Sequence, residues 1–291
     1  MRDDFAVFIL SHGRADRIFT LDSLLKKGRY TGKWYVVIDN EDETAPEYFK
    51  RFPDHVLQFD KLAVSKTFDP ADLSEDRRTI VYARNACFDL ARQIGVKYFL
   101  ELDDDYVYFA FRRLIDDKFH AIFCRDLDTV YSLMVDFLEV SGALSVAFAQ
   151  GGDFIGGARG TGAKKAVLRK CMNSFFCSVD RPFQFVGRIN EDVNTYTTLA
   201  SRGGLFLTIT NVMLCQKITQ SNKGGMTDVY LEKGTYLKSF YTVMMMPSAV
   251  KIATISGGKH RRIHHQVTWN NTAPCILHER YAKRGDVCRE K

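Results

Sequence analysis

Apolar and polar positions along the first third of the chain form blocks that predict strands and helices in turn. Short apolar runs typical of buried strands are each followed by turn residues and then by a stretch with helical spacing. The apolar runs lie at residues 5–10, 34–38, 56–59 and 96–102. The helical stretches lie at residues 15–26, 46–51 and 77–94. This alternation predicts an α/β, Rossmann-like fold with an open, mostly parallel sheet and helices on both faces.

The pattern beyond residue 105 is less regular and predicts a mixture of strands and helices. We expect strands over 106–111 and 144–149, a hairpin within 173–186, and helices over 127–140 and 190–201. Polar, turn-forming segments at 60–75 and 216–234 are expected to be loops. Because no repeat or linker divides the chain, we predict one domain over residues 1–258 and a basic C-terminal extension over 259–291.

Composition restricts the class of protein without identifying a function. The 291 residues are 46% hydrophobic and 26% charged, which is usual for a globular domain. Seven cysteines form no CxxC pair, so reduced thiols are expected rather than a zinc knuckle or disulfide framework. The chain has neither an apolar run of membrane-spanning length nor a signal-peptide pattern, which predicts a cytoplasmic protein that binds no membrane. A formal net charge of +6 permits a polyanionic partner.

The strand at 96–102 runs directly into three consecutive aspartates, Asp103 to Asp105. Adjacent carboxylates at the end of a buried strand repel one another, and burial increases the cost. A hard divalent cation removes that cost and can also bind a diphosphate, so the pattern predicts a metal-dependent phosphate or nucleotide-sugar site. Side chains alternate along a strand, so we expect Asp103 and Asp105 to face the metal and Asp104 to turn toward the donor ribose. A solvated acidic turn or a helix cap is the alternative.

Three motifs resemble those of the GT-A glycosyltransferases, most closely the inverting family-two type. They are Ala83-Arg84-Asn85 in a helix, Asp103-Asp104-Asp105 after the next strand, and Glu191-Asp192 about ninety residues later. The segments ILSHGRADR, GGDFIGGARG, SNKGGMTDVYLEKGTYLKSF and MMMPSAVKI further resemble the phage branch of the TET-associated glycosyltransferases. That resemblance implies a GT-A fold with a nucleotide-sugar half over about 1–110 and an acceptor half over about 111–258.

The resemblance also implies an activity. It is the metal-dependent transfer of a sugar, with inversion, from a UDP-sugar to the hydroxymethyl group of 5-hydroxymethylcytosine or 5-hydroxymethyluracil in DNA. The implied cofactor is Mn²⁺ or Mg²⁺, the implied partners are DNA and the nucleotide sugar, and the implied location is the cytoplasm of a phage-infected bacterium.

The acidic pair on the later helix is the predicted catalytic centre. By resemblance, Asp192 is the base that takes the proton of the acceptor hydroxyl, and Glu191 orients Asp192 or the acceptor. The alternative is that both acids only complement the N-terminal dipole of their helix, with Asn190 as its cap.

The remaining donor-site residues also follow from the resemblance. Arg84 and Asn85 would approach the nucleotide or order the acidic loop; a salt bridge on the helix surface is the alternative. Asp39 would pair with uracil or, alternatively, only form a turn. Ser11, His12 and Arg14 end the first strand, where the base and phosphates would lie, and carboxyl ends of parallel strands gather such groups.

The basic segment near the C-terminus supplies the predicted DNA contacts. Lys259, Arg261 and Arg262 would hold phosphates, although a solvated tail is the alternative. Trp269 would stack on a base, or else be a core or lid residue. In this fold a C-terminal histidine often completes the metal shell, so His264 or His265 is expected there.

Three other functions stay open at this stage. A GT-A enzyme could instead act on a glycan or protein acceptor. A nucleotidyltransferase shares the α/β sheet and acidic metal site, but the segment SHGRADR replaces its glycine-rich phosphate loop. A binding module without catalysis would not need Asp103 to Asp105 and Asp192 intact.

Overall fold

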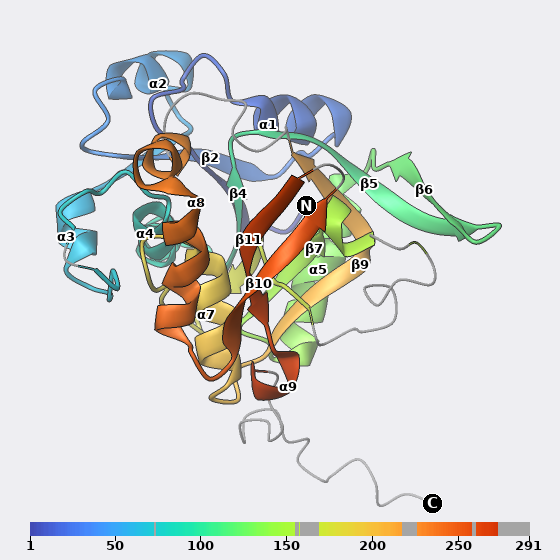
Figure 1. Ribbon diagram of the computed structural model, residues 1–291. Helices are drawn as coiled ribbons and strands as arrows, with labels where there is room; N and C mark the ends of the chain where they lie inside the picture. Colours follow the sequence, from blue (N-terminus) through green and yellow to red (C-terminus); the bar gives the residue numbers. More distant parts are fainter. Residues whose placement is uncertain (73, 155–156, 158–168, 217–225, 258–259, 273–291) are drawn as a thin grey trace, which may run out of the picture.

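A nine-stranded sheet in the order β3-β2-β1-β4-β8-β7-β9-β5-β6 forms the centre of the molecule (Figure 1). The computed structural model describes residues 1–72, 74–154, 157, 169–216, 226–257 and 260–272, with the backbone alone for 226–235, 255–257 and 260–262. The strands of the sheet are β1 (Phe5–Leu10), β2 (Lys33–Asp39), β3 (Val56–Phe59), β4 (Tyr98–Asp103), β5 (Tyr106–Ile115), β6 (Lys118–Phe123), β7 (Ser145–Ala149), β8 (Ser174–Ser178) and β9 (Phe206–Gln216). Strands β8 and β5 run antiparallel to their neighbours, while β3, β2, β1 and β4 are parallel, as are β7 and β9. The predicted α/β class with an open, mostly parallel sheet flanked by helices is confirmed.

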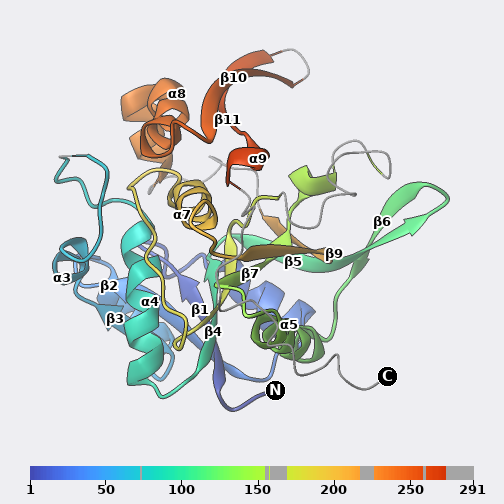
Figure 2. The ribbon, with the colours of Figure 1, turned by 90° about the horizontal axis from the view of Figure 1, so that it is seen from below.

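Helices cover both faces of this sheet (Figure 2). The helical elements are α1 (Phe19–Leu21), the π-helix η1 (Asp22–Lys27), α2 (Ala45–Arg51), α3 (Lys61–Ser65), α4 (Val81–Gln93), α5 (Leu127–Ser141), the 3-10 helix η2 (Gly151–Phe154), α7 (Glu191–Ala200), α8 (Met226–Met245) and α9 (Trp269–Thr272). The sheet passes between α4 and α5, which pack on opposite faces.

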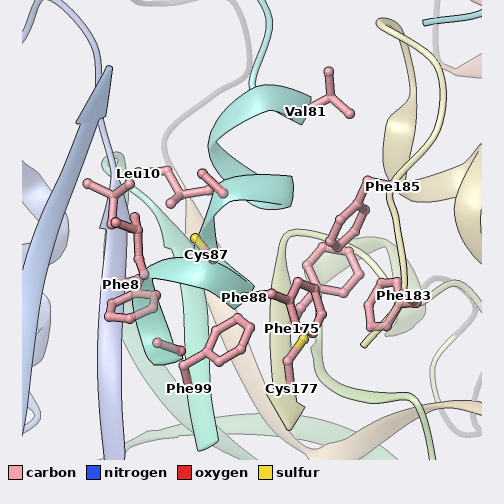
Figure 3. Packing of buried hydrophobic residues seen from close by; sticks show 14 of the residues in the cluster. Phe8, Leu10, Val81, Cys87, Phe88, Phe99, Phe175, Cys177, Phe183 and Phe185 are labelled. Atoms are coloured by element: carbon pink, nitrogen blue, oxygen red, sulfur yellow. The ribbon is translucent and has the colours of Figure 1, made fainter. Parts of the chain in front are cut away.

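Strand β1 shows why the centre of the sheet is fixed. All six of its residues are buried, as expected for a parallel strand covered on both faces. Phe8 and Leu10 point into the core beneath α4, shown in Figure 3, while Val7 and Ile9 point into the core beneath α5. A shift of one residue would exchange the two sets, so the register of β1 is strongly determined.

Several segments differ from the expectations drawn from the sequence. Part of the expected loop at 60–75 is helix α3, whose N-cap Asp60 accepts a hydrogen bond from the amide of Ala63. Residues 226–234 of the second expected loop belong to α8, so that part of the loop prediction is wrong. The expected hairpin at 173–186 is the single strand β8. Strands β6 and β9 were not predicted at all.

The C-terminal part forms a small separate sheet above α7. It consists of the antiparallel strands β10 (Val250–Gly257) and β11 (His260–Val267). The Ser239 hydroxyl of α8 donates to the carbonyl of Ile263 in β11, and the Thr272 hydroxyl of α9 donates to the carbonyl of Thr197 in α7. The predicted boundary after residue 258 falls between the two strands of this sheet. None of the described helices is both long and apolar enough to cross a bilayer.

Candidate active site

The carboxyl ends of β1, β2 and β4 meet at one edge of the sheet. Strand β1 lies between the other two, and its Leu10 is opposite Val37 of β2 and Asp103 of β4. The loops that follow therefore start at the same level. This register brings His12 and Asp39 to the same edge as the three aspartates, as the sequence predicted.

The first of these loops is bound directly to the aspartates. The Ser11 hydroxyl donates to Asp104 Oδ2 at 2.7 Å, and Arg14 Nη1 donates to Asp104 Oδ1 at 3.0 Å. Asp104 is only 4% exposed, and burial raises its pKa while Arg14 and Ser11 oppose that rise. Both oxygens of Asp104 are therefore engaged within the protein.

The end of β2 supplies an aspartate, Asp39, that is ion-paired with His12 of the first loop. His12 Nδ1 lies 2.8 Å from Asp39 Oδ2, and Lys61 Nζ lies 3.2 Å from the same oxygen. Burial alone would raise the pKa of Asp39, but His12 and Lys61 hold it below its usual range, and the hydrogen bond to Asp39 raises the pKa of His12. Asp39 Oδ1 also accepts from the amide of Glu41 at 3.0 Å, so Asp39 forms the turn as well.

Asp103 and Asp105 form the part of the cluster that lacks a complete set of partners. Asp103 Oδ1 accepts from Arg84 Nη2 at 3.0 Å, whereas no described cation forms an ion pair with Asp105. Burial, followed by the charges of Asp103 and Asp104, raises the pKa of Asp105 to about 7. A divalent cation would relieve this repulsion, and carboxylate oxygens are the ligands that Mg²⁺ and Mn²⁺ accept. Two protein carboxylates, with the remaining ligands supplied by a diphosphate and water, would fit such a cation.

Arg84 joins the aspartates to the acidic pair of α7. Its Nε donates to Glu191 Oε1 at 3.0 Å, its Nη2 donates to Asp103, and its Nη1 lies 3.4 Å from Glu101 Oε2. Arg84 is 1% exposed, so the alternative of a surface salt bridge is wrong. Burial would lower its pKa, but the three carboxylates hold that pKa well above the usual value. The side chain orders the acidic loop, which is one of the two roles expected for it.

Asn85, the next residue, points elsewhere. Its Nδ2 donates to the carbonyl of Phe185 at 2.9 Å, and its Oδ1 accepts from the amide of Phe185 at 2.8 Å. The structure therefore brings Asn85 to the loop before α7 rather than to the carboxylate cluster.

Glu191 and Asp192 open α7 and are both buried. Burial and the charge of Asp192 raise the pKa of Glu191 to about 7, and burial also raises the pKa of Asp192. Asn190 has a left-handed backbone with φ 55° and forms no side-chain cap bond. The side-chain amide of Asn190 instead donates to the carbonyl of Lys238 and to the Thr242 hydroxyl in α8. The alternative in which Asn190 caps the helix is therefore wrong.

Two features of this region were missed in the sequence. Lys170 and Lys238 lie close enough to Asp192 to lower its pKa against the effect of burial. No local pattern identifies either lysine. Glu101 is fully buried, and burial raises its pKa to about 8. A glutamate inside an otherwise apolar strand was a visible signal for a buried charge network.

The predicted C-terminal residues fall into separate groups. Lys259 lies outside the described residues, and for Arg261 and Arg262 only the place in β11 is described, opposite Ser256 and Ile255. Trp269 stacks on Tyr196 of α7, with ring centroids 5.8 Å apart. Trp269 therefore has the position of a core or lid residue, which was the alternative to stacking on a base.

The two histidines of β11 lie beside each other, with ring centroids 4.2 Å apart. His265 is 5% exposed, and within the described residues neither ring nitrogen has a hydrogen-bond partner. Burial lowers its pKa to about 3. No three His, Cys, Asp or Glu side chains of the described ranges converge on a possible metal position. The structure thus brings neither His264 nor His265 to Asp103 and Asp105, and the expected histidine ligand is not supported.

Comparison with known proteins places this geometry in a family. The family model described as TET-Associated Glycosyltransferase matches residues 5–225. No curated protein matches the sequence.

Among solved structures, glucosyl-3-phosphoglycerate synthase from Mycobacterium tuberculosis with Mg²⁺ and UDP matches at 12% identity and TM-score 0.46, covering 89% of this chain and 86% of that chain. The same enzyme with Mn²⁺ and UDP-glucose matches at 9% identity and TM-score 0.46, over 90% and 86% of the two chains. A mycobacterial protein matches at 11% identity and TM-score 0.48, over 90% and 83%.

Proposed function

Because the chain belongs to the TET-associated glycosyltransferase family, we propose that it transfers a sugar from a UDP-sugar to the hydroxymethyl group of a 5-hydroxymethylpyrimidine in DNA. The proposed reaction inverts the anomeric centre and requires a divalent cation. The family establishes a glycosyltransferase; the donor, the acceptor, the stereochemistry and the residue roles are our proposal.

One observation supports this assignment of the site more strongly than the other observations do. A single buried arginine, Arg84, contacts Asp103 of the aspartate cluster and Glu191 of the acidic pair. Side chains that are 107 residues apart in sequence, Arg84 and Glu191, are thereby held in a fixed arrangement. A connection from the aspartate cluster to the residue that precedes the proposed base, Asp192, suits a reaction in which acceptor and leaving group must be aligned.

The donor is proposed to lie across the loops after β1, β2 and β4. Asp103 and Asp105 would hold the cation, which would neutralise charge on the departing diphosphate. His12 and Arg14 would lie near the phosphates, because both are held at this edge by aspartates. Asp39, which forms hydrogen bonds at the end of β2, would lie near the uracil.

Asp192 is proposed as the general base. Its carboxylate takes the proton of the acceptor hydroxyl as that oxygen bonds to the anomeric carbon, and the bond from this carbon to the diphosphate breaks to release UDP. Burial raises the pKa of Asp192, which makes its carboxylate a stronger base, while Lys170 and Lys238 favour the ionised form that the step requires. Glu191, hydrogen-bonded to Arg84, would hold the start of α7 in position.

The acceptor nucleobase must leave the duplex to reach Asp192, because this proposed general base is buried in the protein. Asp192 is 8% exposed, so a paired and stacked pyrimidine cannot approach it. A flipped or single-stranded nucleotide can. The cations predicted in β11, Arg261 and Arg262, are proposed to hold the flanking phosphates.

A screen of donors tests this function. The full chain is incubated with DNA containing 5-hydroxymethylcytosine or 5-hydroxymethyluracil, Mn²⁺ and a panel of nucleotide sugars, and the digested nucleosides are weighed. We expect one hydroxymethyl nucleoside to gain the mass of a sugar with a UDP-linked donor. Transfer to a glycan or peptide, with no change in the DNA, would contradict the proposed acceptor and leave the family assignment in place.

A further inference from the structure

Strands β5 and β6 extend well beyond the rest of the sheet (Figures 1 and 2). Strand β5 pairs with β9 only as far as Phe111, and from Arg112 onward β6 is its only partner among the described residues. Residues 112–121 therefore form a two-stranded ribbon, called here the β5–β6 arm. Two-stranded ribbons are marginally stable by themselves, so an arm that keeps Leu114 and Ile115 exposed to solvent suggests an external contact.

The arm ends in a tight turn and is anchored at one point. Asp116 and Asp117 have positive φ angles of 48° and 59°, which suit the two-residue turn of a twisted hairpin. The Arg112 guanidinium lies 4.6 Å from the ring centre of Phe154 in η2 and 5.7 Å from that of Phe119. These contacts hold one face of the arm against η2.

The opposite face of the arm is exposed and cationic. Register places Arg113 opposite His120, and Ile115 opposite Lys118. The side chains of this face are all exposed; they are Arg113, Ile115, Lys118 and His120 of the arm, with Ile122 at its base opposite Phe111. None of its three basic residues forms an ion pair with a described residue, and the two acids of the arm, Asp116 and Asp117, lie in its turn.

We propose that this face of the β5–β6 arm binds duplex DNA beside the nucleotide to be modified. The inference rests on the proposed DNA acceptor. Arg113 and Lys118 match the charge of phosphates, and the aliphatic side chains Ile115 and Ile122 suit sugars and base edges. A two-stranded ribbon also has the dimensions that a major groove admits. A second copy fits this face poorly, because a two-fold interface would oppose its cations to themselves.

The position of the arm defines which DNA it reaches. Strand β5 begins directly after Asp105, so the arm is a continuation of the strand that leaves the aspartate cluster. At about 3.4 Å per residue, the ten steps from Asp105 to Ile115 span roughly 34 Å. This distance equals about ten base pairs of duplex. The arm should therefore contact one flank of the target and not the other.

The test compares two double variants of the full chain with equal loss of charge. Arg113→Ala with Lys118→Ala removes two cations from the arm. Lys50→Ala with Lys66→Ala is the control, because both lysines are exposed and lie on the α2–α3 side of the sheet, away from the arm. The acceptors are a duplex with one 5-hydroxymethylcytosine and long flanks, the same duplex shortened on either side, and a short single strand.

The arm variant should bind the long duplex several-fold more weakly. The slope of log K against log salt should fall by about 2, since each phosphate contact contributes roughly 0.9. Shortening one flank should weaken binding by the wild-type protein and have no further effect on the variant. Release of sugar from the donor and transfer to the short strand should match those of the control. A double variant Ile115→Ser with Ile122→Ser should bind more weakly with the slope unchanged.

Several results would overturn the proposal. One is an arm variant that binds the long duplex with the affinity and salt slope of the control. Another is loss of binding to vesicles of anionic lipid, or loss of a dimer in sedimentation, while DNA binding is unchanged. A failure of the proposed function is distinguishable, because the wild-type protein would then modify neither the long duplex nor the short strand.

Discussion

At position 84 an arginine occupies the point where carboxylates from β4, the aspartate loop and α7 converge. Its place was partly predictable, because residues 81, 84, 88 and 91 lie on one face of a helix and the other three are apolar or small. The sequence left a surface salt bridge open, and the burial of Arg84 in the structure excludes it. Its partners could not be predicted, since Glu191 is distant in sequence and the contact depends on how α7 packs. The positions of Ser11, His12, Asp39 and Asp104 followed from strand order alone.

The structure predicts that Arg84→Lys is not a conservative change. A lysine keeps the charge but cannot donate to three carboxylates in fixed directions. The unpaired buried charges should lower the free energy of unfolding by about 3–5 kcal/mol, and turnover should fall by at least about tenfold. Denaturant unfolding and steady-state rates measure both effects, with Arg92→Lys on the exposed face of α4 as the control. Equal stability and turnover in the two variants would contradict the role given to Arg84.

Asp192→Asn tests the proposed base. The substitution keeps the shape of the side chain and removes its ability to accept a proton. Turnover should fall by roughly two to four orders of magnitude while the Kd for the nucleotide sugar stays nearly constant. Calorimetric titration and single-turnover rates separate the two quantities, and the exposed Asp180→Asn serves as the control. If only donor binding changes, Asp192 is not the base.

Removal of metal tests Asp103 and Asp105. Chelator should abolish transfer, and Mn²⁺ or Mg²⁺ should restore it. Asp105→Asn should retain the fold, because Asp105 forms no ion pair with a described cation, and should lose several kcal/mol of transition-state stabilisation. Rates are compared with those of the exposed Asp16→Asn. Full activity of the wild-type protein in chelator would remove the cation from the mechanism.

At the scale of elements, the strands that could be predicted from the sequence are those that the sheet buries on both faces. Strands β1 and β4 are buried on both faces, so their continuous apolar runs were recognised. Strand β6 is mostly exposed and has no such run, so it was missed. Helix α8 contains Gly234 and polar residues that suggested a loop, and its helical form depends on contacts such as that of Ser239 with β11. Pairings of this kind cannot be inferred from local sequence.

Asn85 tests how α4 holds the loop before α7. Asn85→Asp keeps the acceptor for the Phe185 amide and loses the donor to the Phe185 carbonyl. The free energy of unfolding should fall by about 1 kcal/mol, and the Kd for the nucleotide sugar should not change. Asp89→Ala, on the exposed side of α4, is the control in the same unfolding and titration experiments. A weaker donor Kd at unchanged stability would instead place Asn85 at the nucleotide, as the sequence had suggested.

At the scale of the whole molecule, the loops after β1, β2 and β4 and the acidic pair of α7 meet at one edge of the main sheet. The proposed donor side was largely predictable because strands in a regular α/β order place their carboxyl ends together. The proposed acceptor side was not, since it depends on α7, α8 and β11, whose packing arises from long-range contacts. The formal charge of +6 suits DNA but does not by itself select it.

The most direct test of the account uses one duplex in two forms, with either a hydroxymethyl or a methyl group on a single cytosine. Each form is incubated with the full chain, Mn²⁺ and the UDP-sugar, and the digested nucleosides are analysed by mass and by the NMR coupling at the anomeric carbon. The account predicts one sugar on the hydroxymethyl oxygen, with anomeric configuration opposite to that of the donor, and no product from the methyl duplex. A sugar on the methyl duplex, a retained configuration, or release of free sugar without transfer would contradict it.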